Sequence, residues 1–449
     1  MKNNESKQAL APIMSNISNI KRLITLLIFG LIFTSCMNKK DKIEFKEVRN
    51  IYKSVSPSIS SIQRLNRNDR EFAISNLKTL GNIKGFPLIE IDSLYSDYVF
   101  ATFIYFETIH TKEIEFEVFG IYDEYRFGDR KLYRLDSTDL YYRTYMIPND
   151  LCFAYRFILN DTISGEKQII TDPLNKELIP KGARKNFSWS VLDLRANEPD
   201  WNTKRFDNVG SKLDTITISS IILDNTRNIY VYLPSDYDKT NKKYPVIYLF
   251  DSFIYLNRVE VPNILDNLLH ENKIEPMIAI FIDNPTRTSR DYELPMNPLF
   301  KEFVVNELIP QLKNKYRITD KPAETIIGGI SYGGLAATYI AFEYDSIFGK
   351  VLTQSGSFWR DPNGDLEYAN MNRTDFLINR FIKEKHREIK LFLDWGLQEN
   401  MVYGANRKFV RILNQLNYDF RFIEFNGWHD WSNSRKTFPY GLLYLTDNE

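Results

Sequence analysis

The segment TIIGGISYGGLAATYIA, residues 325–341, carries four glycines around a single serine, Ser331. An apolar, β-branched run precedes the serine, and a helix-forming run follows it. The central letters GISYG fit G-x-S-x-G, the pattern of a nucleophilic serine on a sharp turn between a strand and a helix. The chemistry that this pattern predicts is attack of the Ser331 hydroxyl on a carbonyl carbon, with formation of an acyl intermediate.

The glycines around this serine have separate expected roles. Gly329 and Gly333 frame the turn, because small residues let the backbone double back without a clash. Gly328 and Gly334 are expected to allow close packing of the strand and the helix. Tyr332 would begin the helix, where its main-chain N–H can face a developing oxyanion.

Two other interpretations of the glycines have to be weighed. A phosphate-binding loop would need a lysine followed by serine or threonine after the last glycine, and Leu335, Ala336 and Ala337 stand there instead. A purely structural glycine turn is the second alternative. The presence of partners for the serine decides between these interpretations.

A nucleophilic serine needs a base, and the chain has four histidines. His110 lies in the strand-rich N-terminal part, His270 late in an expected helix and His386 in the charged segment KEKHREIK. His429, in NGWHDW, follows the last expected strand, and in an α/β-hydrolase the base comes last in the chain. We therefore expect His429 to be the base; the alternative is a histidine packed between its two neighbouring tryptophans.

A carboxylate should orient this imidazole from the loop after the preceding strand. The segment LFLDWGLQEN, residues 391–400, offers Asp394 and Glu399. Asp394 falls within the expected strand and Glu399 in the turn after it, so Glu399 is the preferred acid. Asp430 is a third candidate, but its place next to His429 in the sequence makes Nδ1 hard to reach.

A second oxyanion donor is expected in the loop after the apolar run YPVIYLF, residues 244–250. The candidates for this main-chain N–H are Asp251, Ser252 and Phe253. Together with Tyr332, this loop would complete the site.

These residues need a scaffold that brings strand ends together. Strands and helices alternate over residues 212–449, which predicts a mostly parallel sheet with helices on both faces. Residues 61–185 contain short β-branched and aromatic runs that predict a β-sandwich. Residues 186–211 are polar and aperiodic and are expected to form a connector. The expected fold class is α/β, with an α/β-hydrolase domain preceded by a β-sandwich domain.

Composition and charge exclude several other classes of protein. The 449 residues suit two domains, and 58 basic against 58 acidic side chains give a formal net charge of zero, which does not suggest a nucleic-acid partner. Cys36 and Cys152 are the two cysteines, so neither a disulfide framework nor a metal site is expected. Cys152 is expected to be a small buried side chain.

The N-terminal segment has the features of an export signal. Residues 21–36, KRLITLLIFGLIFTSC, join a basic flank to an apolar run that is too short to span a bilayer but fits a secretory signal. Its end resembles the lipobox of a bacterial lipoprotein, in which Cys36 is lipidated. Residues 1–36 are then the signal and 37–60 a tether, and a start at Met14 would give a more usual signal length. The alternative is a plain signal anchor or an apolar helix without a role in export.

Beyond the catalytic pattern, the chain resembles the enterochelin (ferric enterobactin) esterase family, within the putative-esterase group of α/β-hydrolases. The resemblance covers roughly residues 70–449 and rests on the segments SRDYELPMNPLFKEFVVNELIPQL, FGKVLTQSGSFWR, GWHDW, GFPLIE and TDPLN. It implies an immunoglobulin-like β-sandwich ahead of the hydrolase domain. By motif, Ser331 matches the nucleophile, His429 the base and Glu399 the acid.

The resemblance also implies that Arg290 is a site arginine that meets an anionic substrate; the alternative is a surface salt bridge with Glu293. Three features depart from the family. Ser252 stands where the family commonly has glycine, the chain carries a lipoprotein signal although the usual members act inside the cell, and the connector is not recognisable as the family's.

The resulting expectation is a serine esterase that is exported and lipid-anchored to a bacterial membrane, on its periplasmic or cell-surface side. It would need no metal or organic cofactor, and its first expected substrate is a siderophore tri-ester, with the ferric siderophore included, or a related catecholate ester. The alternatives are a carbohydrate esterase that removes feruloyl or acetyl groups and a surface binding lipoprotein without turnover.

Overall fold

The computed structural model describes residues 43–91, 94–107, 111–120, 127–161, 167–179, 188–195, 201, 210–362 and 375–447. The expected signal, with Cys36, and His110 lie outside the described residues. Residues Lys46–Glu449 form one compact unit. Within the described ranges, no helix combines the length and the apolar character that crossing a membrane requires.

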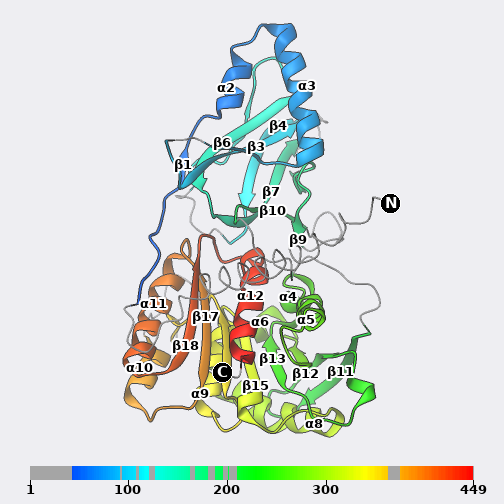
Figure 1. Ribbon diagram of the computed structural model, residues 1–449, viewed down its shortest axis with the longest axis vertical. Coiled ribbons are helices and arrows are strands. Elements are labelled where there is room, and N and C mark those ends of the chain that lie inside the picture. Colours follow the sequence, from blue (N-terminus) through cyan, green and yellow to red (C-terminus); the bar gives the residue numbers. More distant parts are fainter. Residues whose placement is uncertain are drawn as a thin grey trace, which may run out of the picture. The chain divides into compact units, whose positions relative to one another are not determined.

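The first part of this unit contains two antiparallel sheets of five strands each (Figure 1). One sheet has the order β1-β6-β3-β2 with β5 beside β6, and the other has the order β4-β7-β10-β9 with β8 beside β7. The strands are β1 (Tyr52–Lys53), β2 (Leu88–Ile91), β3 (Tyr98–Phe106), β4 (Thr111–Val118), β5 (Tyr133–Arg134), β6 (Leu140–Pro148), β7 (Cys152–Asp161), β8 (Lys167–Ile170), β9 (Leu178–Ile179) and β10 (Trp189–Asp193).

Aromatic side chains from both sheets fill one shared core, as in a β-sandwich. The Phe103 ring of β3 lies 4.3 Å from the Phe116 ring of β4 and 5.0 Å from the Tyr155 ring of β7, measured between centroids. All three side chains are buried. The aromatic-rich strand pattern in the sequence thus marks this core, whereas the immunoglobulin-like class of the sandwich stays a prediction.

Two helices lie between β1 and β2 in the chain and were not expected from the sequence. They are α2 (Pro57–Gln63) and α3 (Arg67–Lys84). In α3, Ile74 and Leu77 pack against sandwich residues that include Phe106, while most of the helix is exposed. Such a narrow apolar stripe leaves only a weak helical period in the sequence.

The expected tether, residues 37–60, and connector, residues 186–211, both differ from the structure. The compact unit begins at Lys46, whose main-chain N–H donates to Glu424 Oε2 at 2.6 Å. Strand β1 and the start of helix α2 already lie within the expected tether. Strand β10 lies in the expected connector and pairs with β7. These elements are too short for hydrophobic periodicity to reveal them among polar neighbours.

The second part is built on an eight-stranded sheet with the order β11-β12-β14-β13-β15-β16-β17-β18. β12 pairs in antiparallel with both of its neighbours, β11 and β14. The remaining pairs along the sheet, β14-β13-β15-β16-β17-β18, are all parallel, which confirms the predicted mostly parallel sheet. The strands are β11 (Lys212–Ser220), β12 (Asn225–Leu233), β13 (Val246–Phe250), β14 (Ile278–Ile282), β15 (Thr325–Ile330), β16 (Lys350–Gln354), β17 (Lys390–Gly396) and β18 (Asp419–Phe425).

Helices cover both faces of this sheet (Figure 1). Adjacent residues of β16 point to the two sides: Leu352 packs in the cluster that includes α5 and α12, whereas Thr353 faces α9 at Gly334. The helices are α4 (Ser252–Asn257), α5 (Val261–His270), α6 (Arg287–Glu293), α7 (Pro298–Glu302), α8 (Ile309–Lys315), α9 (Tyr332–Glu343), α10 (Phe376–Lys383), α11 (Asn400–Gln415) and α12 (Trp431–Thr446). The shorter turns are η1 (Tyr237–Lys239), the π-helix η2 (Phe303–Leu308) and η3 (Pro322–Glu324).

Parallel pairing brings the carboxyl ends of the central strands to one edge. In the register of the sheet, Ile330 of β15 pairs with Gln354 of β16, and Gln354 pairs with Asp394 of β17. Asp394 in turn pairs with Ile423 of β18. The loops after these strands therefore leave the sheet side by side, where ligands bind in open α/β sheets.

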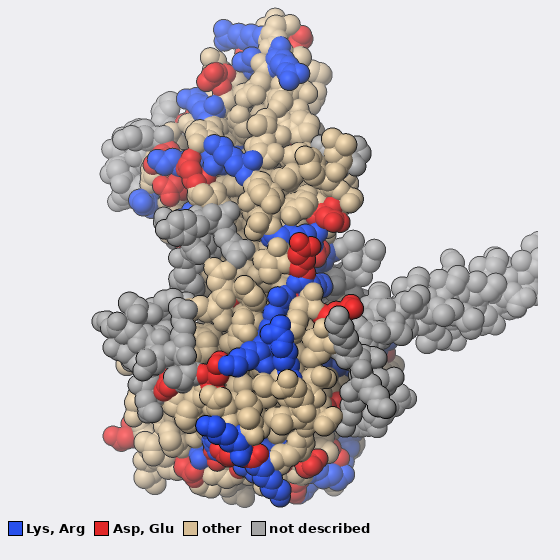
Figure 2. Space-filling model, turned by 90° about the vertical axis from the view of Figure 1, so that its left-hand side faces the viewer, with Lys and Arg blue, Asp and Glu red and all other residues tan. Residues whose placement is uncertain are grey.

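The described surface carries charges of both signs. On the face shown in Figure 2, acidic and basic side chains lie close to one another. Lys212 pairs with Asp238, and Lys313 Nζ lies 2.8 Å from Asp320 Oδ1, all on exposed or half-exposed side chains. Such pairs contribute only about 0–1 kcal/mol each, so stability has to come from the core.

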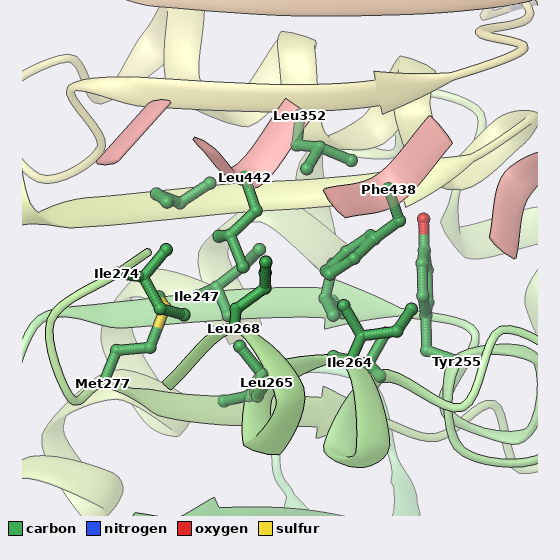
Figure 3. Packing of buried hydrophobic residues seen from close by; sticks show 14 of the residues in the cluster. Ile247, Tyr255, Ile264, Leu265, Leu268, Ile274, Met277, Leu352, Phe438 and Leu442 are labelled. Carbon is green, nitrogen blue, oxygen red and sulfur yellow. The ribbon is translucent and has the colours of Figure 1, made fainter. Parts of the chain in front are cut away.

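The core under one face of the sheet joins α5 to α12. Figure 3 shows Ile264, Leu265 and Leu268 of α5 lying close to Phe438 and Leu442 of α12. All five side chains are fully buried. This packing fixes the position of α12, which begins directly after the loop that carries His429.

Replacing Phe438 with alanine should therefore destabilise the fold. The cavity left in this core is expected to cost about 3–5 kcal/mol of unfolding free energy, measured by urea denaturation. Phe72→Ala, at a position that is 70% exposed, is the control and should cost less than about 0.5 kcal/mol. Equal shifts of the two variants would contradict the assignment of Phe438 to the core.

Candidate active site

Ser331 occupies the sharp turn that its sequence pattern predicts. It lies between the end of β15 and the first residue of α9, with φ 60° and ψ −119°. Its main-chain N–H donates to the Gln354 carbonyl oxygen at 2.8 Å, which ties the turn to the neighbouring strand β16. A non-glycine residue with this backbone is strained, and such strain concentrates at functional sites.

Two of the four glycines, Gly329 and Gly334, meet the packing roles expected of them, whereas a Cβ added to Gly328 would meet the neighbouring strand β16 rather than the helix, with the Leu352 carbonyl oxygen at 2.8 Å. A Cβ added to Gly329 would lie 2.4 Å from the carbonyl carbon of Gly333, so the turn closes only without a side chain there. A Cβ added to Gly334 would lie 2.3 Å from Thr353 Oγ1, so α9 packs closely on β16 only with glycine at this position. Gly329 and Gly334 are thus required by the geometry that presents Ser331.

His429 and Glu399 form a close pair at the same edge of the sheet. Glu399 follows β17, His429 follows β18, and His429 Nδ1 lies 2.6 Å from Glu399 Oε2. The second oxygen, Oε1, accepts hydrogen bonds from the Ser355 hydroxyl at 2.7 Å and from the Gly396 N–H at 2.7 Å. The buried carboxylate is therefore held on one side and presented to the imidazole on the other.

The protonation of His429 is governed by this carboxylate. Burial by itself lowers the pKa of the imidazole, but the charge of Glu399 and its hydrogen bond outweigh burial, so the pKa is raised above its usual value. Arg290 acts in the opposite direction and Asp430 weakly in the same direction as Glu399. This environment favours an imidazole that takes up a proton during a reaction.

The two other acid candidates have different partners. Asp394 lies within β17, accepts from Gln354 Nε2 at 3.0 Å and from the Ser355 N–H at 3.2 Å, and has a pKa raised to about 7 by burial. Asp430 caps α12, where Oδ1 accepts from the Ser432 N–H at 2.8 Å. The structure thus brings Glu399, and neither aspartate, to Nδ1 of His429.

The loop after β13 is anchored by a two-pronged ion pair. Asp251, in the left-handed region with φ 64°, accepts from Arg290 Nε at 2.6 Å and from Arg290 Nη2 at 2.7 Å. Asn284 Nδ2 donates to the same carboxylate at 2.6 Å. Ser252 begins α4, and its hydroxyl donates to Asp283 Oδ1 at 2.8 Å. These contacts hold Asp251 and Ser252, two of the three candidate oxyanion residues of this loop.

This loop lies next to the turn at Ser331. A Cβ added to Gly333 would lie 3.4 Å from Asp251 Oδ2, and β13 pairs directly with β15. The main-chain N–H of Tyr332 stands in the first turn of α9, where the helix dipole favours negative charge. The expected oxyanion residues and the expected nucleophile are thus brought together.

Arg290 has a partner other than the one weighed from the sequence. Its guanidinium binds Asp251, and the desolvation that lowers its pKa is outweighed by that carboxylate, so the pKa is raised. Glu293 is buried and pairs with Arg227 Nη2 at 2.8 Å. The alternative that Arg290 forms a surface salt bridge with Glu293 is therefore wrong. Arg290 instead supports the loop after β13.

Two serines of the segment FGKVLTQSGSFWR join the site without having been singled out. Ser355, with φ 48°, is the hydroxyl donor to Glu399. Ser357 places its Oγ 3.3 Å from Ser331 Oγ and donates its N–H to the Ser331 carbonyl oxygen at 3.2 Å. The segment had been noticed only as a resemblance, because a serine after a strand has no distinctive spacing of its own.

The remaining candidates from the sequence have structural places. Cys152 is a free, fully buried thiol, as expected. His270 ends α5, and the His386 ring stacks on Tyr418 with centroids 4.1 Å apart. Over the described part of the chain, no group of three or more His, Cys, Asp and Glu side chains is placed to hold a metal ion.

Comparison with known proteins identifies a family of esterases. The sequence profile of the family described as "Putative esterase" matches residues 220–445. The iron(III) enterobactin esterase of Escherichia coli O6:H1 (strain CFT073) is 28% identical over 284 residues, which cover 62% of this chain and 68% of the relative. That of Dickeya dadantii (strain 3937) is 26% identical over 54% of this chain and 61% of its own length.

Solved structures show the same fold. The ferric enterobactin esterase of Salmonella typhimurium superposes with a TM-score of 0.70 at 22% identity, over 82% of this chain and 98% of that one. The enterobactin esterase of Shigella flexneri, crystallised in the presence of enterobactin, has a TM-score of 0.68 at 22% identity, over 81% and 97%. With a family profile that spans residues 220–445, the chain belongs to the putative esterase family, as an enterochelin esterase-like hydrolase of ester bonds.

Proposed function

We propose that the chain is a serine esterase in which Ser331 is the nucleophile, His429 the base and Glu399 the acid that orients it. One observation carries the proposal: a strained serine at a strand-to-helix turn shares its sheet edge with a histidine–carboxylate pair at 2.6 Å. The chain order Ser, Glu, His is that of the α/β-hydrolases.

The reaction follows from these positions. His429 takes the proton of the Ser331 hydroxyl as Oγ bonds to the ester carbonyl carbon, whose π electrons move onto oxygen. The oxyanion is stabilised by the Tyr332 N–H and by a main-chain N–H of the loop at Asp251 and Ser252. The C–O bond to the alcohol then breaks, and the alcohol leaves with the proton from His429. A water molecule then attacks the carbonyl carbon of the acyl-enzyme, with His429 again taking the proton. The bond to Ser331 Oγ breaks, Oγ regains the proton from His429, and the acid is released.

The substrate that we propose is a siderophore ester of the enterobactin type, or a related catecholate ester. The names of the relatives support this class. A positive charge beside the residue that follows the nucleophile suits an anionic substrate as well: the guanidinium carbon of Arg360 lies 5.9 Å from the ring centroid of Tyr332. Arg290 lies 5.7 Å from the same ring, but its charge is paired with Asp251.

We further propose that the protein is exported and anchored through a lipid on Cys36, and that its sandwich is immunoglobulin-like. The basic flank, short apolar run and lipobox-like end of residues 21–36 support the anchor. Metabolic labelling with a fatty-acid analogue tests it: label should enter the wild type but not Cys36→Ser, and equal labelling would contradict the anchor.

Ser331→Ala should abolish turnover. Without its nucleophile, the enzyme is expected to hydrolyse p-nitrophenyl acetate at least about 10³-fold more slowly in kcat/KM, with an unchanged circular dichroism spectrum. Ser219→Ala, at an exposed position of β11, is the matched control and should retain wild-type activity. Unchanged hydrolysis by Ser331→Ala would show that another residue attacks the ester.

The substrate class can be separated by a panel of esters. We expect a cyclic tri-ester of catecholoyl-serine to be hydrolysed with the highest kcat/KM, ahead of feruloylated and acetylated sugars. A higher kcat/KM on a feruloyl or acetyl sugar would favour the carbohydrate-esterase alternative and contradict the siderophore proposal, while leaving the serine mechanism intact.

Glu399→Gln should move the pH dependence of kcat/KM in a defined direction. His429 has to be neutral to accept a proton, so activity falls as the pH drops below its pKa, which in the wild type is raised above the ordinary value of about 6.5. Without the Glu399 charge, burial and Arg290 still lower the pKa, so the acid limb moves to lower pH. The plateau is expected to fall on the order of 10⁴-fold.

Asp394→Asn tests the competing acid in the same assay. The Asp394 carboxylate accepts from the Ser355 N–H, whereas Glu399 contacts the imidazole itself, so the acid limb should stay close to its wild-type position. A shifted limb in Asp394→Asn together with an unshifted one in Glu399→Gln would assign the acid to Asp394 instead.

A further inference from the structure

The loop that carries His429 is built against the β-sandwich. The Cys152 N–H, at the start of β7, donates to the Asn426 carbonyl oxygen at 3.0 Å. Two residues along β7, the Ala154 N–H donates to Asp430 Oδ2 at 3.2 Å. The main chain of β7 thus holds this loop on both sides of His429.

Ring contacts flank the same histidine. Trp428 belongs to the sandwich core, where its ring centroid lies 5.2 Å from that of Phe127 and 5.5 Å from that of Phe153. Trp431 places its ring 4.0 Å from that of Phe119. The residues before and after the imidazole are therefore seated on the sandwich.

Gly120, which follows β4, makes the closest approach. Its φ is +76°, and a Cβ added to it would lie 2.6 Å from the carbonyl oxygen of His429 and 3.1 Å from the carbonyl carbon. Both distances are shorter than an ordinary contact, so the His429 main chain would have to shift to admit a side chain. Position 120 therefore requires glycine for two reasons: its φ is positive, and a side chain there would clash with the main chain of His429.

We propose that the β-sandwich is a positioning part of the catalytic site: Gly120 and strand β7 fix the main chain of His429, so that its imidazole meets Glu399 at the sheet edge that also carries Ser331. The inference rests on the proposed roles of these three residues. It gives the sandwich a task in the chemical step itself, through residues that touch no substrate.

The test compares two alanine substitutions in the full-length chain. Gly120→Ala introduces a left-handed alanine and the clash with His429. Gly128→Ala introduces a left-handed alanine at φ +58° with no atom of the described residues within 4 Å of its Cβ, so it reproduces the backbone strain alone. Phe119→Leu removes the ring contact with Trp431 without adding strain, and serves if Gly120→Ala fails to fold.

Two measurements are made on each variant. With p-nitrophenyl acetate, Gly120→Ala should lower kcat about 10–100-fold with KM within about two-fold, because a small displacement of a catalytic group costs rate. Gly128→Ala should leave both constants within about two-fold of the wild type. Phe119→Leu should act in the same direction as Gly120→Ala, by a smaller factor.

The second measurement follows the His429 imidazole by NMR with labelled histidine, using His429→Gln to identify its signal. The charged groups that face this ring are Glu399, Arg290 and Asp430. In Gly120→Ala the titration should move to lower pH, because the ring loses part of its contact with Glu399, whereas in Gly128→Ala it should not move.

The two measurements separate the failure of this inference from that of the proposed function. Equal kcat values and equal titrations in the two glycine variants would contradict the positioning role, and so would a Phe119→Leu variant with wild-type values. A wild type without hydrolysis of any ester would contradict the proposed function, while the titration would still decide whether the sandwich positions His429.

Discussion

The parallel pairing of β15, β16, β17 and β18 is the constraint on which the site depends. Because their carboxyl ends are level in the sheet, the loops that carry Ser331, Glu399 and His429 start next to one another although they are far apart in the chain. The strained backbone at Ser331 and the 2.6 Å contact between His429 and Glu399 are local consequences of that register. A slip between two of these strands would separate the groups.

Around this register, polar side chains with no part in the reaction hold the reacting ones. Ser355 and the Gly396 N–H occupy one oxygen of Glu399, which leaves the other to the imidazole. Arg290 and Asn284 hold Asp251 in its left-handed conformation. Such support matters because a catalytic group has to be held close to its productive geometry before the substrate arrives.

The central features of the site followed from the sequence because each has a distinctive signal. G-x-S-x-G between a strand and a helix marked Ser331, and the order of strands singled out His429 and preferred Glu399 over Asp394. Chain segments that depend on distant contacts gave no such signal. Strand β10 is visible only through its pairing with β7, and the partner of Arg290 is Asp251 rather than the nearby Glu293. Gly120 likewise has a role only once β4 is seen beside the His429 loop.

The most direct test of the central claim is covalent labelling of the wild-type chain by a fluorophosphonate, followed by mass spectrometry of its peptides. Because such a probe reacts with an activated serine hydroxyl, the account predicts one adduct, on the peptide that contains Ser331, and a much slower reaction in His429→Gln. An adduct on a different serine, or no adduct on the folded wild type, would contradict the claim that Ser331 is the nucleophile.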